Sequence, residues 1–175
     1  MISDQRYLNW QKELASRIFF RRFWVFWAVY SVILIFCAVL YLLTTRQLKV
    51  VVVAFDTFLL GRFIVSPLIY LFYKKQRPFQ KLNFEIIKSR LFSPSVKRPN
   101  SFPSDHAISF AAIITVIIYY FPLLGICLIA VGVLNGTARV ILGHHYVIDI
   151  LAGWIIGALS ALIVIYWLAP RLFTR

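Results

Sequence analysis

Three consecutive residues with reactive side chains, Ser104, Asp105 and His106, follow Pro103 and precede a long apolar run. A helix that begins at Asp105 would have Ser104 as its N-cap, and its free backbone N–H groups and partial positive charge would face an anion. The same pattern is also typical of an ordinary helix start. A second cluster further along the chain decides between these two interpretations.

The second cluster lies between two later apolar runs and contains Arg139, His144, His145 and Asp149. His145 and Asp149 are four residues apart, a spacing that lets a carboxylate one helical turn away accept the proton of an imidazole nitrogen. The other imidazole nitrogen would then be oriented and basic, as a nucleophilic or general-base histidine requires. The sequence therefore predicts a hydrogen bond between these two side chains.

Cations near both clusters could bind a phosphate group. Arg77 and Arg139 can each donate two hydrogen bonds to phosphate oxygens, whereas Lys74 and Lys75 would act as point charges. The helix start at Ser104 would add backbone N–H groups. Since one hydrogen bond to a charged group contributes about 1.5–3 kcal/mol, three or four of them would form a phosphoryl-binding pocket.

A metal centre is the competing chemistry. The chain has only six Asp and Glu residues, and we expect Asp105 and Asp149 alone among them at the site, too few for a two-metal phosphatase. A zinc site of His106, His144 and His145 would satisfy the ligand preferences of zinc. Because the neighbouring Arg and Lys side chains would repel a cation, we expect no metal and no cofactor.

The composition indicates an integral membrane protein. Of the 175 residues, 61% are hydrophobic, and the mean hydropathy of +0.81 is far above that of a soluble domain. The net charge of +13 favours anionic partners, which in a membrane protein are lipid headgroups rather than nucleic acid. Cys37 and Cys127 lie in apolar runs, so we expect buried thiols. The sequence does not specify an oligomeric state.

The apolar runs predict an all-α, polytopic bundle that forms a single domain over residues 1–175. About 20 residues cross about 30 Å of hydrocarbon, and five runs qualify: 23–43, 48–73, 106–121, 123–142 and 147–168. Residues 1–22 have the pattern of an amphipathic helix on the membrane surface, and the polar segment 74–103 must lie outside the bilayer. Counting the crossings places all the polar clusters on the same face.

Two ionisable residues, Asp56 and Arg62, lie inside the second predicted span, where a charge is costly and suggests a functional role. They are six residues apart and do not share a helix face. We therefore expect separate structural pairings, or side chains that extend to the interface.

Three groups of residues, in this order along the chain, resemble the three-motif signature of the type 2 phosphatidic acid phosphatase family, the lipid phosphate phosphatases. They are Arg77-Pro78, Pro103-Ser104-Asp105-His106, and Arg139 with His145 and Asp149. The resemblance covers residues 74–149 and the flanking spans.

The resemblance implies a role for each residue. His145 would attack phosphorus to give a phosphohistidine and Asp149 would orient it, while His106 would protonate the leaving oxygen and later activate water. The residues implied to bind the phosphate are Arg77, Ser104, Arg139 and a lysine. The implied function is removal of a terminal phosphate from a membrane lipid such as lipid A 1-phosphate, undecaprenyl diphosphate, phosphatidylglycerol phosphate or phosphatidic acid.

The chain departs from the family pattern at three positions. Tyr70 replaces the lysine seven positions before Arg77, so Lys74 or Lys75 must substitute for it. Ala138 replaces a serine, and Asp105 replaces the more frequent glycine, a variant that resembles bacterial isoprenoid diphosphate phosphatases. A second Arg-Pro pair, Arg98-Pro99, is an alternative for the first motif. Because Arg77 directly ends a span and Arg98 does not, we prefer Arg77 and expect Lys97 and Arg98 at the rim of the site.

Two other functions use the same residues. A transferase would pass the phosphoryl group to a lipid or sugar alcohol instead of water, and a lipid-binding protein would keep the pocket without turnover. Basic residues in 74–98 could favour a headgroup with a second phosphate, which places lipid A and lipid diphosphates ahead of phosphatidic acid.

Charge and resemblance give opposite answers about the side of the membrane. Most Lys and Arg residues gather on the face of the polar clusters, so the positive-inside rule would place the site in the cytoplasm. Bacterial members of the resembled family generally act at the periplasmic face, and some of these charges would serve phosphate binding. We expect a multi-pass protein of the bacterial inner membrane with a periplasmic site.

Overall fold

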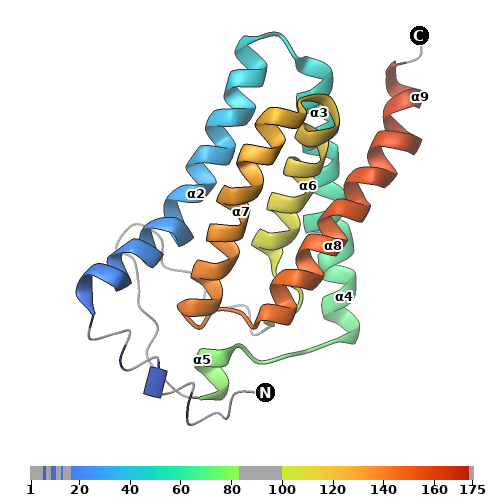
Figure 1. The fold of residues 1–175 in the computed structure, drawn as a ribbon. Helices are drawn as coiled ribbons and strands as arrows, with labels where there is room; N and C mark the ends of the chain where they lie inside the picture. The colour runs from blue at the N-terminus through green and yellow to red at the C-terminus, as the bar shows by residue number, and fades with distance from the viewer. Residues whose placement is uncertain (1–5, 7–8, 11–12, 14–16, 83–99, 174–175) are drawn as a thin grey trace.

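The computed structural model describes residues 6, 9–10, 13, 17–82 and 100–173, and throughout these residues the regular elements are helical (Figure 1). The all-α prediction is therefore confirmed. The elements in chain order are α2 (Ile18–Thr44), α3 (Leu48–Leu59), the π-helical segment η1 (Leu60–Val65), α4 (Ser66–Phe72), α5 (Pro78–Lys81), α6 (Asp105–Tyr120), α7 (Pro122–Ile141), α8 (Val147–Ile163), the π-helical segment η2 (Val164–Leu168) and α9 (Ala169–Phe173).

Three helices in the described part of the chain are long and apolar enough to cross a membrane: Phe19–Thr44, Pro122–Ile141 and Val147–Leu172. The helix Asp105–Tyr120 is apolar but shorter. The segments α3, η1 and α4 follow one another without a gap over Leu48–Phe72. The count of five spans remains a prediction.

The first long helix begins at Ile18 rather than at residue 23. The helix therefore includes Arg21 and Arg22 of the predicted surface segment, and the start of the first span at residue 23 remains a prediction. Most of the predicted surface helix lies outside the described residues.

The outer faces of the bundle are apolar and exposed, as a lipid environment requires; examples are Phe36, Phe55 and Ile155. Cys37 and Cys127 are also exposed, so the expectation of buried thiols is wrong. An apolar run alone does not distinguish a side chain that faces lipid from one that faces the bundle.

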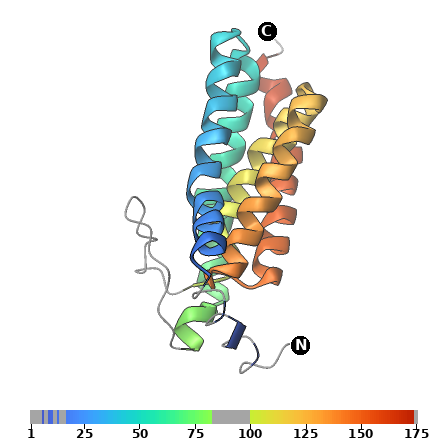
Figure 2. The ribbon, with the colours of Figure 1, turned by 60° about the vertical axis from the view of Figure 1, so that its left-hand side comes forward.

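Helix α6 lies inside the bundle and packs against α3, α7 and α8. Its side chains Ile108, Ile114, Val116 and Ile117 are fully or almost fully buried. Figures 1 and 2 show α6 enclosed by its neighbours from two directions. This central helix therefore holds the residues at its N-terminus in a fixed position.

The polar segments meet at one end of the bundle. In Figure 1, α5 and the junction of α7 with α8 lie at the opposite end from the α2–α3 turn. The start of α6 lies there too, because Ser104 N–H donates to the carbonyl oxygen of Asp149 in α8 at 3.0 Å. The prediction that the clusters converge on one face is confirmed for the described residues.

Gly157 allows α8 to lie directly against α6. A Cβ atom at this position would be 2.3 Å from the carbonyl oxygen of Ile108 and 2.8 Å from Cβ of Ala111. Small residues at such contacts let two helices approach closely, which is a main source of stability between helices in a membrane.

We expect Gly157→Ala to lower the thermal unfolding midpoint of the detergent-solubilised protein, because the added methyl group meets backbone atoms that cannot move aside. Gly136→Ala is the matched control, since the contact of its Cβ is a single side-chain atom, Cγ2 of Ile150. Equal midpoints for the two variants would contradict the close packing of α6 and α8.

Candidate active site

His145 lies in the turn between α7 and α8, and its side chain is almost completely buried. Gly143, with a φ of 75°, reverses the chain after α7. The N–H groups of His144 and His145 then donate to the carbonyl oxygen of Arg139 at 2.9 and 3.3 Å. The histidine is thus positioned by backbone hydrogen bonds on its N-terminal side.

The Nδ1 atom of His145 lies 2.8 Å from the carbonyl oxygen of Ser101. Oδ2 of Asp149 is 3.9 Å from the same atom, too far for a hydrogen bond. The predicted hydrogen bond between His145 and Asp149 is therefore wrong. His145 precedes the first residue of α8, so the geometry of residues four apart on one helix does not apply to this pair.

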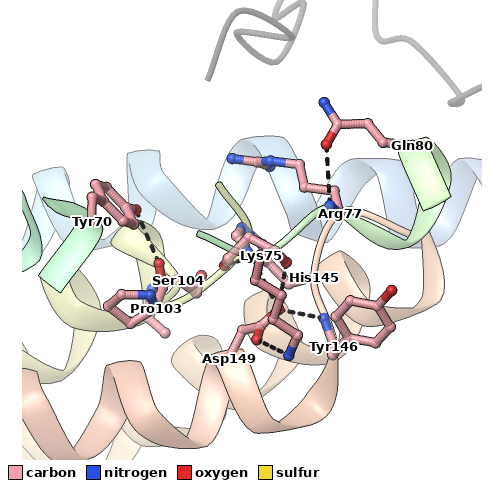
Figure 3. Close-up of polar contacts among 11 residues, drawn as sticks. Tyr70, Lys75, Arg77, Gln80, Pro103, Ser104, His145, Tyr146 and Asp149 are labelled. Atoms are coloured by element: carbon pink, nitrogen blue, oxygen red, sulfur yellow. Dashed lines mark hydrogen bonds and ion pairs between the residues drawn. The ribbon is translucent and has the colours of Figure 1, made fainter. Parts of the chain in front are cut away.

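Asp149 is completely buried and accepts three hydrogen bonds from other groups (Figure 3). Lys75 Nζ is 2.7 Å from Oδ1, while the hydroxyl of Ser101 and the backbone N–H of Tyr146 donate to Oδ2 at 2.5 and 2.9 Å. Its carboxylate therefore acts on the histidine through Ser101, whose hydroxyl it fixes and whose carbonyl group binds the ring.

Lys75 is held by Asp149 and by an aromatic ring. Its ammonium group lies 4.3 Å from the ring centroid of Tyr146, within the range of a cation–π interaction. Lys74 is exposed. Of the two lysines predicted to bind phosphate, the structure places Lys75 beside the catalytic candidate Asp149.

Ser104 caps α6 as predicted. Its hydroxyl oxygen accepts from the N–H of Ala107 at 3.5 Å, and the side chain is completely buried. Tyr70, at the position of the missing lysine, donates its hydroxyl to the carbonyl oxygen of Pro103 at 3.0 Å. Tyr70 therefore supports the backbone that leads into α6.

Arg139 is buried among neutral acceptors. Nε donates to Oδ1 of Asn135 at 3.1 Å, and Nη2 donates to the carbonyl oxygen of Ala28 in α2 at 3.2 Å. Asn135 in turn donates to the hydroxyl of Ser31 at 2.6 Å. Sequence reasoning missed Asn135, although a polar residue one helical turn before a motif arginine was a signal that could have indicated it.

Asp105 forms an ion pair with Arg62 across two helices. Its other carboxylate oxygen accepts the hydroxyl of Ser66 at 2.6 Å. The expectation that Arg62 and Asp56 pair separately is confirmed for Arg62. Arg62 lies in the π-helical segment η1, and such segments are frequent at functional sites.

His106 is partly buried in the first turn of α6 and lines a cavity of about 230 Å³ together with Arg62 and Asp105. Arg77 is half-buried at the start of α5, where its backbone N–H donates to Gln80. Lys97 and Arg98, the predicted rim residues, lie outside the described residues.

The histidines of the α7–α8 turn are held in the neutral form. Burial, followed by the positive charges of Arg77 and Arg139, lowers the pKa of His145 well below 6.5, and the carbonyl group of Ser101 opposes this only in part. Burial and the same two arginines lower the pKa of His144 to about 3. Both rings are therefore unprotonated at neutral pH.

Residues 51–173 match the PAP2 superfamily. The chain belongs to this superfamily. It is 41% identical over 73 residues to the bacitracin transport permease protein BcrC of Bacillus licheniformis, over 42% of this chain and 36% of the relative. It is 28% identical over 131 residues to the undecaprenyl-diphosphatase BcrC of Bacillus subtilis, over 75% of this chain and 64% of the relative.

The chain thus spans less than two thirds of the length of the curated relatives it matches. No solved structure matches it. The PAP2 match covers all three motif groups, which confirms the family resemblance. Among the described residues, no group of three or more His, Cys, Asp or Glu side chains is arranged to hold a metal ion.

We expect the buried neutral ring of His144 to make this PAP2 protein less stable in acid. The unfolded chain binds a proton at His144 below a pKa of 6.5, whereas the folded chain does so only near 3. Between these values the unfolded state holds more protons, so stability falls as the pH falls, by about 1.4 kcal/mol per pH unit for one group.

The thermal unfolding midpoint, measured in detergent at pH 7.5 and pH 5, tests this expectation. His144→Gln cannot titrate, so its midpoint should fall less between the two pH values than that of the unsubstituted protein. An equal fall in both proteins would show that His144 is not a buried neutral group.

Proposed function

We propose that this chain is a metal-independent lipid phosphate phosphatase whose substrate is a lipid diphosphate of the undecaprenyl diphosphate type. The observation that carries the proposal is a buried, neutral His145 whose Nδ1 atom is bound to a carbonyl oxygen in a site rich in arginine. Membership of the PAP2 superfamily and similarity to an undecaprenyl-diphosphatase support the reaction and the lipid.

His145 is the nucleophile of the proposed reaction. A carbonyl oxygen accepts a hydrogen bond only from a protonated Nδ1, so the neutral ring carries its lone pair on Nε2. Nε2 attacks the terminal phosphorus, a P–N bond forms, and the bond from phosphorus to the bridging oxygen breaks in line with it. The product of this first step is a phosphohistidine and a lipid monophosphate.

His106 is the acid and base of the proposed reaction. It donates a proton to the bridging oxygen as that oxygen leaves, and it then takes a proton from the water that attacks the phosphohistidine. Inorganic phosphate departs and both histidines return to their first state. The position of His106 in the first turn of α6, where its side chain lines the cavity next to Asp105, supports this role.

Positive charge stabilises the phosphoryl group in the transition state. Arg77 and Arg139 are the proposed bidentate ligands, and the first turn of α6 behind Ser104 adds backbone N–H groups. Arg139 is held in place by Asn135 and α2 rather than by a carboxylate, so a phosphate can bind it without displacing an anion. Lys75 supports the site indirectly, because its ammonium group binds Asp149, the carboxylate that fixes Ser101.

Phosphate release from purified lipids tests the proposed function. We expect undecaprenyl diphosphate to be hydrolysed with a higher kcat/KM than phosphatidylglycerol phosphate, lipid A or phosphatidic acid. His145→Ala should lower turnover on the order of a thousandfold or more, as loss of a nucleophile does. His144→Gln, at the adjacent buried histidine, is the matched control and should keep turnover within about tenfold.

Near-normal turnover of His145→Ala would show that another group is the nucleophile. Transfer of phosphate to an added alcohol, with little released to water, would identify a transferase instead. Binding of these lipids without any turnover would identify a lipid-binding protein.

We further propose that the site faces the periplasm of a bacterial inner membrane. Lys81 on α5 is exposed at the site end of the bundle, and Lys49 is exposed near the other end. In a Cys37→Ser/Cys127→Ser background, we expect Lys81→Cys in intact spheroplasts to react with an impermeant thiol reagent. Lys49→Cys should react only after the membrane is opened, and the reverse pattern would place the site in the cytoplasm.

A further inference from the structure

A cavity of about 230 Å³ lies between α2, α3 and α6, and its lining is divided into a polar and an apolar part. The polar part is formed by Arg62, Asp105, His106 and Ser109. The remaining lining side chains are all apolar, among them Val32 of α2 and Phe58 of α3. A ligand that fits such a cavity has a polar group at one end and hydrocarbon at the other.

His106 connects this cavity with the proposed reaction. Attack by His145 in line with the breaking bond drives the leaving oxygen to the side opposite His145, where His106 must reach it to give up its proton. Because His106 also lines the cavity, the leaving group extends into it. In a lipid diphosphate the first group beyond the bridging oxygen is the second phosphate, and the hydrocarbon follows.

Arg62 provides the positive charge at this place. The side chain of Arg62 is about a quarter exposed and forms an ion pair with Asp105 on the cavity wall. Asp105 immediately precedes His106 in the chain. Ser66 fixes the other oxygen of Asp105 at 2.6 Å. A guanidinium has five N–H donors in a planar fork, so its pairing with one carboxylate is compatible with a contact to a phosphate.

We propose that Arg62 binds the lipid-proximal phosphate of a diphosphate substrate, and that Asp105 and Ser66 are positioning residues that hold Arg62 for this contact. The inference rests on the proposed phosphatase function. During reaction, the P–O bond to the bridging oxygen breaks and its electron pair stays on the departing lipid monophosphate. Arg62 stabilises that negative charge, while the proton from His106 goes to the same group.

The same contact selects between substrates. A lipid monophosphate has no second phosphate for Arg62 to bind, and its leaving group is an alkoxide that depends on the proton from His106 alone. Arg62 therefore raises kcat/KM for the diphosphate and leaves that for the monophosphate almost unchanged. A single charged hydrogen bond of about 1.5–3 kcal/mol corresponds to a factor on the order of 10 to 100.

The experiment compares farnesyl diphosphate with farnesyl monophosphate as substrates of this protein in detergent. The main variant is Arg62→Gln/Asp105→Asn, which removes both charges, keeps a polar side chain at each position and leaves no single buried charge. We expect the ratio of the two kcat/KM values, diphosphate over monophosphate, to fall on the order of 10- to 100-fold. Thermal unfolding of the variant checks its fold.

Arg62→Lys is the second variant and carries the test if the double variant does not fold. It keeps the charge but loses the planar fork, so the ratio should fall several-fold. An unchanged ratio in a folded variant, whether both activities are kept or both fall together, would overturn the inference. If the unsubstituted protein hydrolyses neither substrate, the proposed function fails instead.

Discussion

The buried carboxylate of Asp149 is the interaction on which the rest of the site depends. It joins three segments that are far apart in sequence: the chain after α4 through Lys75, the chain before α6 through Ser101, and the first turn of α8 through the N–H of Tyr146. A completely buried carboxylate is costly unless it is paired and hydrogen-bonded. The three segments must therefore be in place together, and only then does the carbonyl group of Ser101 lie where it can orient His145.

Positive charge from two arginine side chains acts on the ring of His145 beside this carboxylate. Arg139 is bound to neutral acceptors on α2 and α7, and Arg77 and Arg139 both lower the pKa of His145. Burial and this positive charge together keep the imidazole neutral, which is the form that the proposed nucleophile requires. Donors that are already oriented towards the place where charge develops need little reorganisation during the reaction. In the proposed reaction, the same positive charge serves both the nucleophile and the substrate.

Much of the fold and the site could be predicted from sequence because their signals are local. Apolar runs predict the helices, and Ser104 before such a run predicts the start of α6. Counting the crossings predicts that the polar clusters lie at one end of the bundle. The partner of His145 could not be predicted in this way. Asp149 is the third residue of α8 and turns back to the N–H of Tyr146, while Ser101 comes from a segment whose position depends on tertiary structure.

The ion pair of Arg62 shows the same limit in a helix. Its partner lies on α6, and the π-helical segment η1 changes which side chains face that helix, so no spacing within Leu48–Phe72 indicates the contact. Gly61 lets η1 lie close to α6 and α8, and this closeness makes the ion pair possible. A Cβ atom at Gly61 would be 2.8 Å from Cγ2 of Ile108 and 3.3 Å from Oγ of Ser160. The close approach of η1 to α6 and α8 at this glycine brings the next residue, Arg62, within reach of Asp105. The charged wall of the cavity thus depends on the absence of a side chain at Gly61.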